Sequence, residues 1–115
     1  MPRRALATAA MLLLTSSGIT LALATDAGAV TCGAHKVTTI HGAEAEYRLT
    51  CKNGNLRVHG WVKDTRPDDD FAALHVHAGN GEVRSAFANG WREVEHFSFT
   101  FADTSSAEVR LSLDH

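Results

Sequence analysis

Three histidines lie on two neighbouring stretches of the chain at spacings that could bring their imidazoles together. His59 lies in the stretch 56–63, and His75 and His77 lie close together in the stretch 71–78. If the two stretches form one antiparallel hairpin with their aliphatic side chains inward, the outer face pairs His59 with His75 and places Arg57 opposite His77. Imidazole is the commonest protein ligand of transition metals, so this cluster could bind a metal ion such as zinc.

A plain surface role for these histidines is the interpretation that we favour. An outward strand face needs polar residues that tolerate pleated geometry, and histidine meets both needs. A flat sheet also lacks the concavity and the supporting carboxylates of a tuned metal site. The chain contains no Gly-x-Ser-x-Gly, His-Glu-x-x-His or Cys-x-x-Cys motif and no phosphate-binding glycine loop. We therefore predict no cofactor and no catalytic residue, and hence no enzyme.

Trp61 shares the predicted outer face with these residues. Tryptophan and arginine are over-represented among the side chains that anchor protein interfaces, and a tryptophan can also stack on a sugar ring. We predict a binding module that contacts a protein partner outside the cell through Arg57, His59, Trp61, His75 and His77. Binding of a carbohydrate or of a transition metal, and inhibition of an enzyme, are the alternatives. The indole could equally lie beneath the segment 30–35.

Three adjacent aspartates, Asp68, Asp69 and Asp70, lie in the loop 64–70. Calcium takes about six to eight oxygen ligands from spaced positions, whereas consecutive aspartates point in different directions. We therefore predict a solvated turn in which the aspartates accept hydrogen bonds from the turn backbone. This loop is also the candidate contact in the enzyme-inhibitor alternative.

The elements that must position these residues are strands. The stretch 56–63 alternates, with Leu56, Val58, Gly60 and Val62 on one face and Arg57, His59, Trp61 and Lys63 on the other, which is the period of a half-buried strand. We predict this strand over 55–63 and further strands at 36–41, 45–52, 71–78, 82–88, 93–102 and 107–113. Asn-Gly pairs at 53–54, 80–81 and 89–90 predict hairpin turns, because both turn positions need a positive φ. Seven short strands predict an all-β fold, a small antiparallel two-sheet sandwich, with a small barrel as the alternative.

The first 29 residues have the three parts of a secretory signal peptide. Arg3 and Arg4 supply the positive start, the segment 5–24 is apolar, and Ala27-Gly28-Ala29 fits the small-x-small cleavage rule. Ala22-Leu23-Ala24 is a competing cleavage site, and an uncleaved membrane anchor is the alternative to cleavage. We predict a signal peptide over 1–29, a single secreted domain over 30–115 and no membrane attachment after cleavage.

Cys32 and Cys51 are the only cysteines of the chain. Both lie in the predicted secreted domain, and cysteines in an oxidising compartment pair by default, so we predict a disulfide between them. A bridge that closes a loop of this length stabilises a small domain by about 3 kcal/mol through loop entropy. A free thiol or a metal-ligand pair is the alternative.

The charge of the chain argues against two classes of partner. Two of the 11 basic and one of the 13 acidic residues lie in the predicted leader, so the remainder carries a net charge of about −3 with neutral histidine. Binding to nucleic acid or to an anionic membrane surface would need a basic patch. We therefore predict neither as a partner. All seven histidines lie in the predicted secreted domain.

The run 58–65, Val-His-Gly-Trp-Val-Lys-Asp-Thr, is followed by an Asp-rich turn and, further on, by Phe97-Ser98-Phe99 and the stretch 109–113. This pattern resembles the small secreted β-sandwich proteins that are abundant in actinobacteria, over residues 50–113. Many of those proteins carry a further cysteine after the turn, where this chain continues with Phe71. The resemblance implies a sandwich fold and export, and it carries over no catalytic residue.

Overall fold

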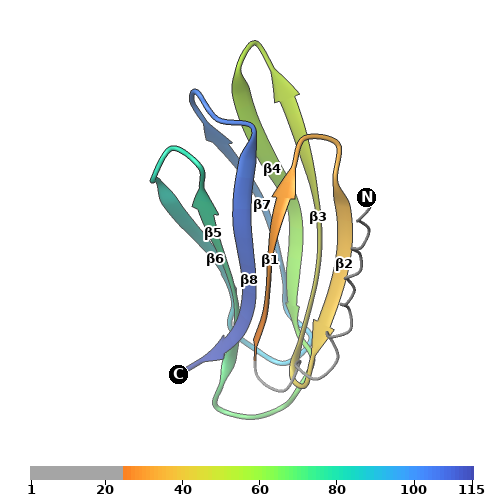
Figure 1. Ribbon diagram of the computed structural model, residues 1–115. Helices are drawn as coiled ribbons and strands as arrows, with labels where there is room; N and C mark the ends of the chain where they lie inside the picture. Colours follow the sequence, from red (N-terminus) through yellow and green to blue (C-terminus); the bar gives the residue numbers. More distant parts are fainter. Residues whose placement is uncertain (1–24) are drawn as a thin grey trace, which may run out of the picture.

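The computed structural model describes residues 25–115, which form two four-stranded antiparallel sheets packed as a sandwich (Figure 1). The strands are β1 (Thr25–Thr31), β2 (His35–Ile40), β3 (Ala43–Lys52), β4 (Asn55–Asp64), β5 (Phe71–Ala78), β6 (Val83–Ala88), β7 (Val94–Phe101) and β8 (Ser106–Asp114). The predicted all-β sandwich is confirmed, with eight strands instead of seven. Within the described residues, no helix is long and apolar enough to cross a membrane.

Each sheet combines hairpins with a strand from a distant part of the chain. One sheet has the order β2-β3-β4-β7, and the other has the order β1-β8-β5-β6. The connections β2–β3, β3–β4 and β5–β6 stay within a sheet, whereas the other four cross between the sheets. β1 and β8 therefore lie side by side although they are far apart in the sequence (Figure 1).

The alternation predicted for the stretch 56–63 is confirmed in β4. Leu56, Val58 and Val62 are fully buried, whereas Arg57 is exposed on the other side of the strand. The largest of the remaining fully buried aliphatic and aromatic side chains come from β3, β5, β7 and β8, and they are Leu49, Leu74, Val76, Phe101 and Leu111. The core thus lies between the two sheets, and the polar residues of β4 point away from it, except Asp64 at the end of the strand, which is buried.

Two of the three Asn-Gly pairs lie in hairpin connections as predicted, but only the pair at 53–54 has a positive φ at both positions, because Asn80 does not. Asn53 and Gly54 have φ values of 55° and 81° and join β3 to β4, and the pair at 80–81 joins β5 to β6. The pair at 89–90 does not make a hairpin, because β6 and β7 belong to different sheets. Gly90 has a positive φ in the loop that carries the chain from β6 in one sheet to β7 in the other.

The predicted hairpin between the stretches 56–63 and 71–78 is wrong. β4 pairs with β3 and β7, and β5 pairs with β6 and β8. The loop between them crosses from one sheet to the other, held at its start by backbone hydrogen bonds from Asp64 N–H to Glu93 O and from Thr65 N–H to Gly42 O, both 3.1 Å. The apolar faces of the two strands therefore meet the same core from opposite sheets.

β1 lies partly in the segment that the sequence assigns to the leader. It pairs with β8 from Thr25 to Thr31, so residues 25–29 belong to the sandwich, and the domain boundary predicted at residue 30 falls inside a strand. The rest of the predicted leader, residues 1–24, lies outside the described residues. Leader cleavage and secretion stay predictions.

The predicted disulfide between Cys32 and Cys51 is confirmed, with a Cα–Cα distance of 5.5 Å. Cys32 lies in the turn that carries the chain from β1 to β2, and Cys51 lies in β3. Backbone hydrogen bonds join the same turn to the same strand, from Gly33 N–H to Leu49 O at 2.7 Å and from Leu49 N–H to Ala34 O at 2.9 Å. The bridge therefore fixes a crossing between the two sheets.

Candidate binding face

The outer surface of the sheet β2-β3-β4-β7 carries Trp61 near its middle, and we call this surface the tryptophan face. Its outward positions alternate along each strand with positions that face the other way, and the strand registers place them in rows across the sheet. They are His35, Val37 and Thr39 in β2, Glu44, Glu46, Arg48, Thr50 and Lys52 in β3, Asn55, Arg57, His59, Trp61 and Lys63 in β4, and Val94, His96, Ser98 and Thr100 in β7.

The structure brings together three of the five predicted binding residues. Arg57, His59 and Trp61 share the tryptophan face, as predicted. His75 and His77 lie in β5, on the outer surface of the other sheet. The predicted cluster of His59 with His75 and His77 is therefore wrong, because it depended on the β4–β5 hairpin that does not form.

His75 has its own partners on the far side of the sandwich. Its Nδ1 lies 2.7 Å from Ser85 Oγ, its Nε2 lies 3.4 Å from Asp114 Oδ2, and its ring meets Phe87 edge-on with 5.9 Å between the ring centroids. Of the His, Cys, Asp and Glu side chains in residues 25–115, no three lie close enough to hold a metal ion together.

Trp61 is partly exposed and is held in place by β3. Its indole Nε1–H donates a hydrogen bond to Glu46 Oε1 at 3.2 Å, and the other oxygen of this carboxylate lies 2.6 Å from His35 Nε2. The three residues come from three adjacent strands, since Glu46 lies directly opposite Trp61 in the register. The indole is therefore fixed in orientation by its polar edge while one part of the ring stays accessible to a ligand.

The hydrogen bond with His35 lowers the pKa of the Glu46 carboxyl below its ordinary value of 4.5. Burial works against this shift, and the indole N–H of Trp61 and the charges of His35 and Arg48 add to it. Glu46 is thus a carboxylate at neutral pH, and in this form it accepts the hydrogen bond from the indole N–H.

Gly60 lets β4 approach β3 closely beside Trp61. A Cβ atom at this position would overlap the carbonyl oxygen of Glu46 and would lie 2.7 Å from Tyr47 Cα. Glycine in a strand interior often marks such a close approach between backbones. Above it lies a shallow depression of about 240 Å³, lined by Glu46, Tyr47, Arg48, His59, Gly60 and Trp61. We call it the indole depression.

A second depression lies further along the same strand pair, toward the β3–β4 turn. It has a volume of about 310 Å³ and is lined by Thr50, Lys52, Asn53, Asn55, Leu56, Arg57 and Thr100. We call it the hairpin depression. Arg57 Nε–H donates a hydrogen bond of 2.9 Å to Ser98 Oγ, which fixes the guanidinium across the β4–β7 pair. The lining combines two cations with hydroxyl and amide groups, a set that suits an anion.

His59 lies between the two depressions in an electropositive environment. Burial lowers the pKa of this imidazole below 6.5, and the charges of Arg57 and Arg48 lower it further. The imidazole is therefore neutral at pH 7.

Sequence reasoning missed Glu46, Arg48, His35 and His96 as members of this face. The positions of Glu46 and Arg48 could have been predicted from the sequence. The turn at 53–54 sets Lys52 opposite Asn55, and the same register places Glu46 opposite Trp61. His96 lies opposite Trp61 on the other side, in β7. That pairing joins strands that are separated by β5 and β6, and no local signal identifies it.

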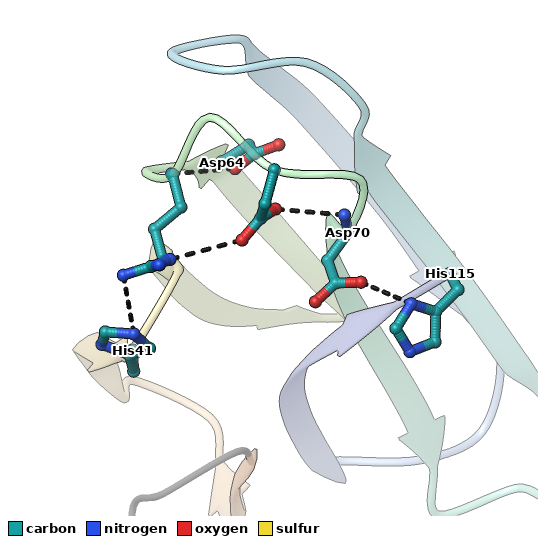
Figure 2. Close-up of polar contacts among 6 residues, drawn as sticks. His41, Asp64, Asp70 and His115 are labelled. Atoms are coloured by element: carbon teal, nitrogen blue, oxygen red, sulfur yellow. Dashed lines mark hydrogen bonds and ion pairs between the residues drawn. The ribbon is translucent and has the colours of Figure 1, made fainter.

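The loop 64–70 is organised by its own carboxylates, as the predicted turn requires (Figure 2). Asp68 Oδ1 accepts the backbone N–H of Asp70 at 3.0 Å, and Asp68 Oδ2 accepts Arg66 Nε–H at 3.3 Å. Arg66 also donates to His41 Nε2 at 2.7 Å, and Asp70 pairs with His115. These contacts place the loop against the β2–β3 turn and the end of β8, away from the tryptophan face.

No protein family model, no curated protein and no solved structure matches this chain. The resemblance to small secreted actinobacterial β-sandwich proteins stays a prediction.

Proposed function

We propose that the protein is a non-catalytic binding module that contacts a protein partner outside the cell through the tryptophan face. The observation that carries the proposal is the setting of Trp61. The indole is partly exposed near the middle of a four-stranded sheet, and Glu46 fixes its orientation, so little side-chain freedom is lost when a partner covers it. Fixed aromatic side chains of this kind are frequent energetic centres of protein interfaces.

The surroundings of the indole have the composition of a protein interface. Val37 in β2 is 62% exposed and Val94 in β7 is 41% exposed, so apolar groups lie on both flanks of Trp61. Arg48 and Arg57 lie along the strands, and arginine is enriched in interfaces together with tryptophan. Both depressions are open to solvent, which suits contact with a second surface better than a reaction that must exclude water.

The proposal is tested by affinity capture from culture medium with the wild-type protein, Trp61→Ala and Trp91→Ala. Trp91 is the matched control, because it is the only other tryptophan, is 54% exposed and lies in the β6–β7 loop. We expect Trp61→Ala to lose a protein that the wild type and Trp91→Ala both capture. Thermal unfolding monitored by circular dichroism checks that each variant is folded.

A second variant keeps the test valid if Trp61→Ala does not fold. Val37→Glu places a charge on the same face at a position that is already largely exposed. Capture of every partner by both variants at the wild-type level would overturn the proposal. If the variants fail to capture a polysaccharide that the wild type captures, and lose no protein, the tryptophan face would be assigned to carbohydrate binding instead.

A further inference from the structure

We propose that the hairpin half of the tryptophan face binds an extended acidic segment of the partner protein. The hairpin half consists of Arg48, Thr50 and Lys52 in β3, Asn55, Arg57 and His59 in β4, and Ser98 and Thr100 in β7. This inference rests on the proposed function, and it adds the chemistry of the ligand.

The hairpin half contains three permanent cations, Arg48, Lys52 and Arg57, and no carboxylate, in a chain whose net charge is −2. None of the ion pairs among residues 25–115 includes any of the three. A local positive surface on a negative protein is complementary to an acidic ligand, and it is not explained by internal pairing.

The nearest acidic groups lie at the borders of this region. Glu46 is in the next row of the sheet, where it is engaged by Trp61 and His35. Asp103 lies beyond the hairpin end, where its backbone N–H donates to Asn55 Oδ1 at 3.3 Å. Burial is the main cause of the lowered pKa of His59, and the charges of Arg57 and Arg48 add to it, which agrees with a positive potential between these borders.

The hairpin depression places Lys52 and Arg57 beside Thr50, Asn55 and Thr100, so a carboxylate there meets two cations together with neutral hydrogen-bond donors. Arg57 is already held by Ser98, so its guanidinium is positioned before a ligand arrives.

The two depressions follow one another along the β3–β4 pair. Arg57 and Trp61 are four residues apart on the same strand, which corresponds to about 13 Å. An extended segment laid along β4 spans this distance with five residues, and its alternate side chains face the sheet. Both β3 and β4 already have strand partners on each side, so such a segment would be held by its side chains.

Glu46 distinguishes an acidic peptide from a uniformly charged polymer. Its carboxylate lines the indole depression, and its lowered pKa keeps it ionised. The hairpin depression has two cations and no carboxylate, whereas the indole depression has one cation, Arg48, against the carboxylate of Glu46. A nucleic acid or a sulfated glycan would bring negative charge to both, and it would gain less in the indole depression. A peptide can instead confine its acidic residues to one end and place an apolar side chain against Trp61.

The test is an NMR titration of the ¹⁵N-labelled protein with the blocked peptide Glu-Ser-Glu-Ser-Phe-Ser and with the neutral peptide Gln-Ser-Gln-Ser-Phe-Ser. The Arg57 Nε–H and the Trp61 indole N–H report on the two depressions separately. We expect the acidic peptide to shift both resonances in a saturable way. We expect the double variant Lys52→Gln/Arg57→Gln to weaken the binding of this peptide by about tenfold.

The matched control is Arg110→Gln, which removes one exposed cation from the outer surface of the other sheet, opposite His75, and is expected to leave binding unchanged. Equal binding of the two peptides, no binding of either, or equal binding by the double variant and the wild type would overturn the inference. Stronger binding of polygalacturonate, an anionic polysaccharide, than of the acidic peptide would also overturn it. None of these results bears on whether Trp61 is needed for partner capture, so failure of this inference can be told apart from failure of the proposed function.

Discussion

The buried carboxylate of Asp64 accepts a hydrogen bond from the backbone N–H of Gly90 at 3.4 Å, although 26 positions separate the two residues. Its other oxygen accepts the backbone N–H of Arg66 at 3.1 Å, and the residue is only 1% exposed. One side chain therefore joins the loop that carries the chain from β4 to β5 with the loop that carries it from β6 to β7. It fixes two of the four crossings between the sheets.

Replacing Asp64 by alanine is expected to lower the free energy of unfolding by about 2 kcal/mol, because two partly buried N–H groups lose their acceptor. Asp64→Asn keeps one acceptor oxygen and should lose less. Asp69→Ala is the control, since Asp69 is exposed in the same loop. Urea unfolding of the three variants measures these differences. Equal stability of Asp64→Ala and Asp69→Ala would show that the two hydrogen bonds contribute little.

Gly60→Ala is expected to destabilise the protein by about 3 kcal/mol, because the added methyl group would meet the β3 backbone at Glu46 and Tyr47, which cannot move aside as a side chain can. Gly28→Ala in β1 is the matched control. No atom lies within 4 Å of a Cβ built there, so no loss of stability is expected. The midpoints of thermal unfolding compare the two variants. A Gly60→Ala protein as stable as Gly28→Ala would contradict the close approach of β4 to β3.

The free energy of unfolding is expected to fall with decreasing pH in two separate pH ranges, an upper window set by His59 and a lower window set by Glu46. The pKa of His59 is lower in the folded protein than its ordinary value of 6.5, so the unfolded chain binds the proton more tightly and stability falls as the pH drops below about 6.5. The pKa of Glu46 is also lowered by folding, so its contribution is present above pH 4.5 and is lost as the pH falls through the folded value.

Urea midpoints measured from pH 8 to pH 3 separate these two effects. His59→Gln should remove the pH dependence of the upper window and leave the lower one. Glu46→Gln should remove the pH dependence of the lower window and leave that of the upper one. His77→Gln, on the outer surface of the other sheet, serves as the control for the loss of one imidazole. A profile for His59→Gln that matches the wild type in the upper window would mean that the environment of His59 does not disfavour its protonation.

If the predicted leader is removed, β1 indicates where. Cleavage after Ala29 would leave only Val30 and Thr31 of the strand that pairs with β8, whereas cleavage after Ala24 would keep all of it. We therefore expect the exported protein to begin at Thr25. N-terminal sequencing of protein secreted from a Gram-positive host measures this directly. Ala24→Leu should impair processing and Ala29→Leu should not, and a secreted chain that begins at Val30 would contradict the expectation.

The part of the fold that local signals encode could be predicted from the sequence. The alternation in β4 separates Val58 from His59, the turn at Asn53 and Gly54 joins β3 to β4, and the cysteine pair indicates the disulfide. Each of these features depends on a residue type and its near neighbours along the chain, so the physics that fixes it is visible in a short window of sequence.

The crossings between sheets could not be predicted in the same way. Asp64 ends β4 with a carboxylate whose partner, Gly90, lies in another loop, and nothing near Asp64 in the sequence identifies that partner. The stretches 56–63 and 71–78 have the pattern of a hairpin, yet their apolar faces meet across the core. β1 escaped prediction for a different reason, because its small residues also fit the end of a leader.

The position of β8 sets the order in which the molecule can assemble during synthesis. Both β1 and β5 pair with β8, so the sheet that contains them stays incomplete until the ribosome has made the final strand. β2, β3 and β4 are consecutive hairpins and can associate as they emerge. β1 must therefore stay unpaired until β8 has emerged from the ribosome, so the sandwich closes only after both of these distant strands have been made.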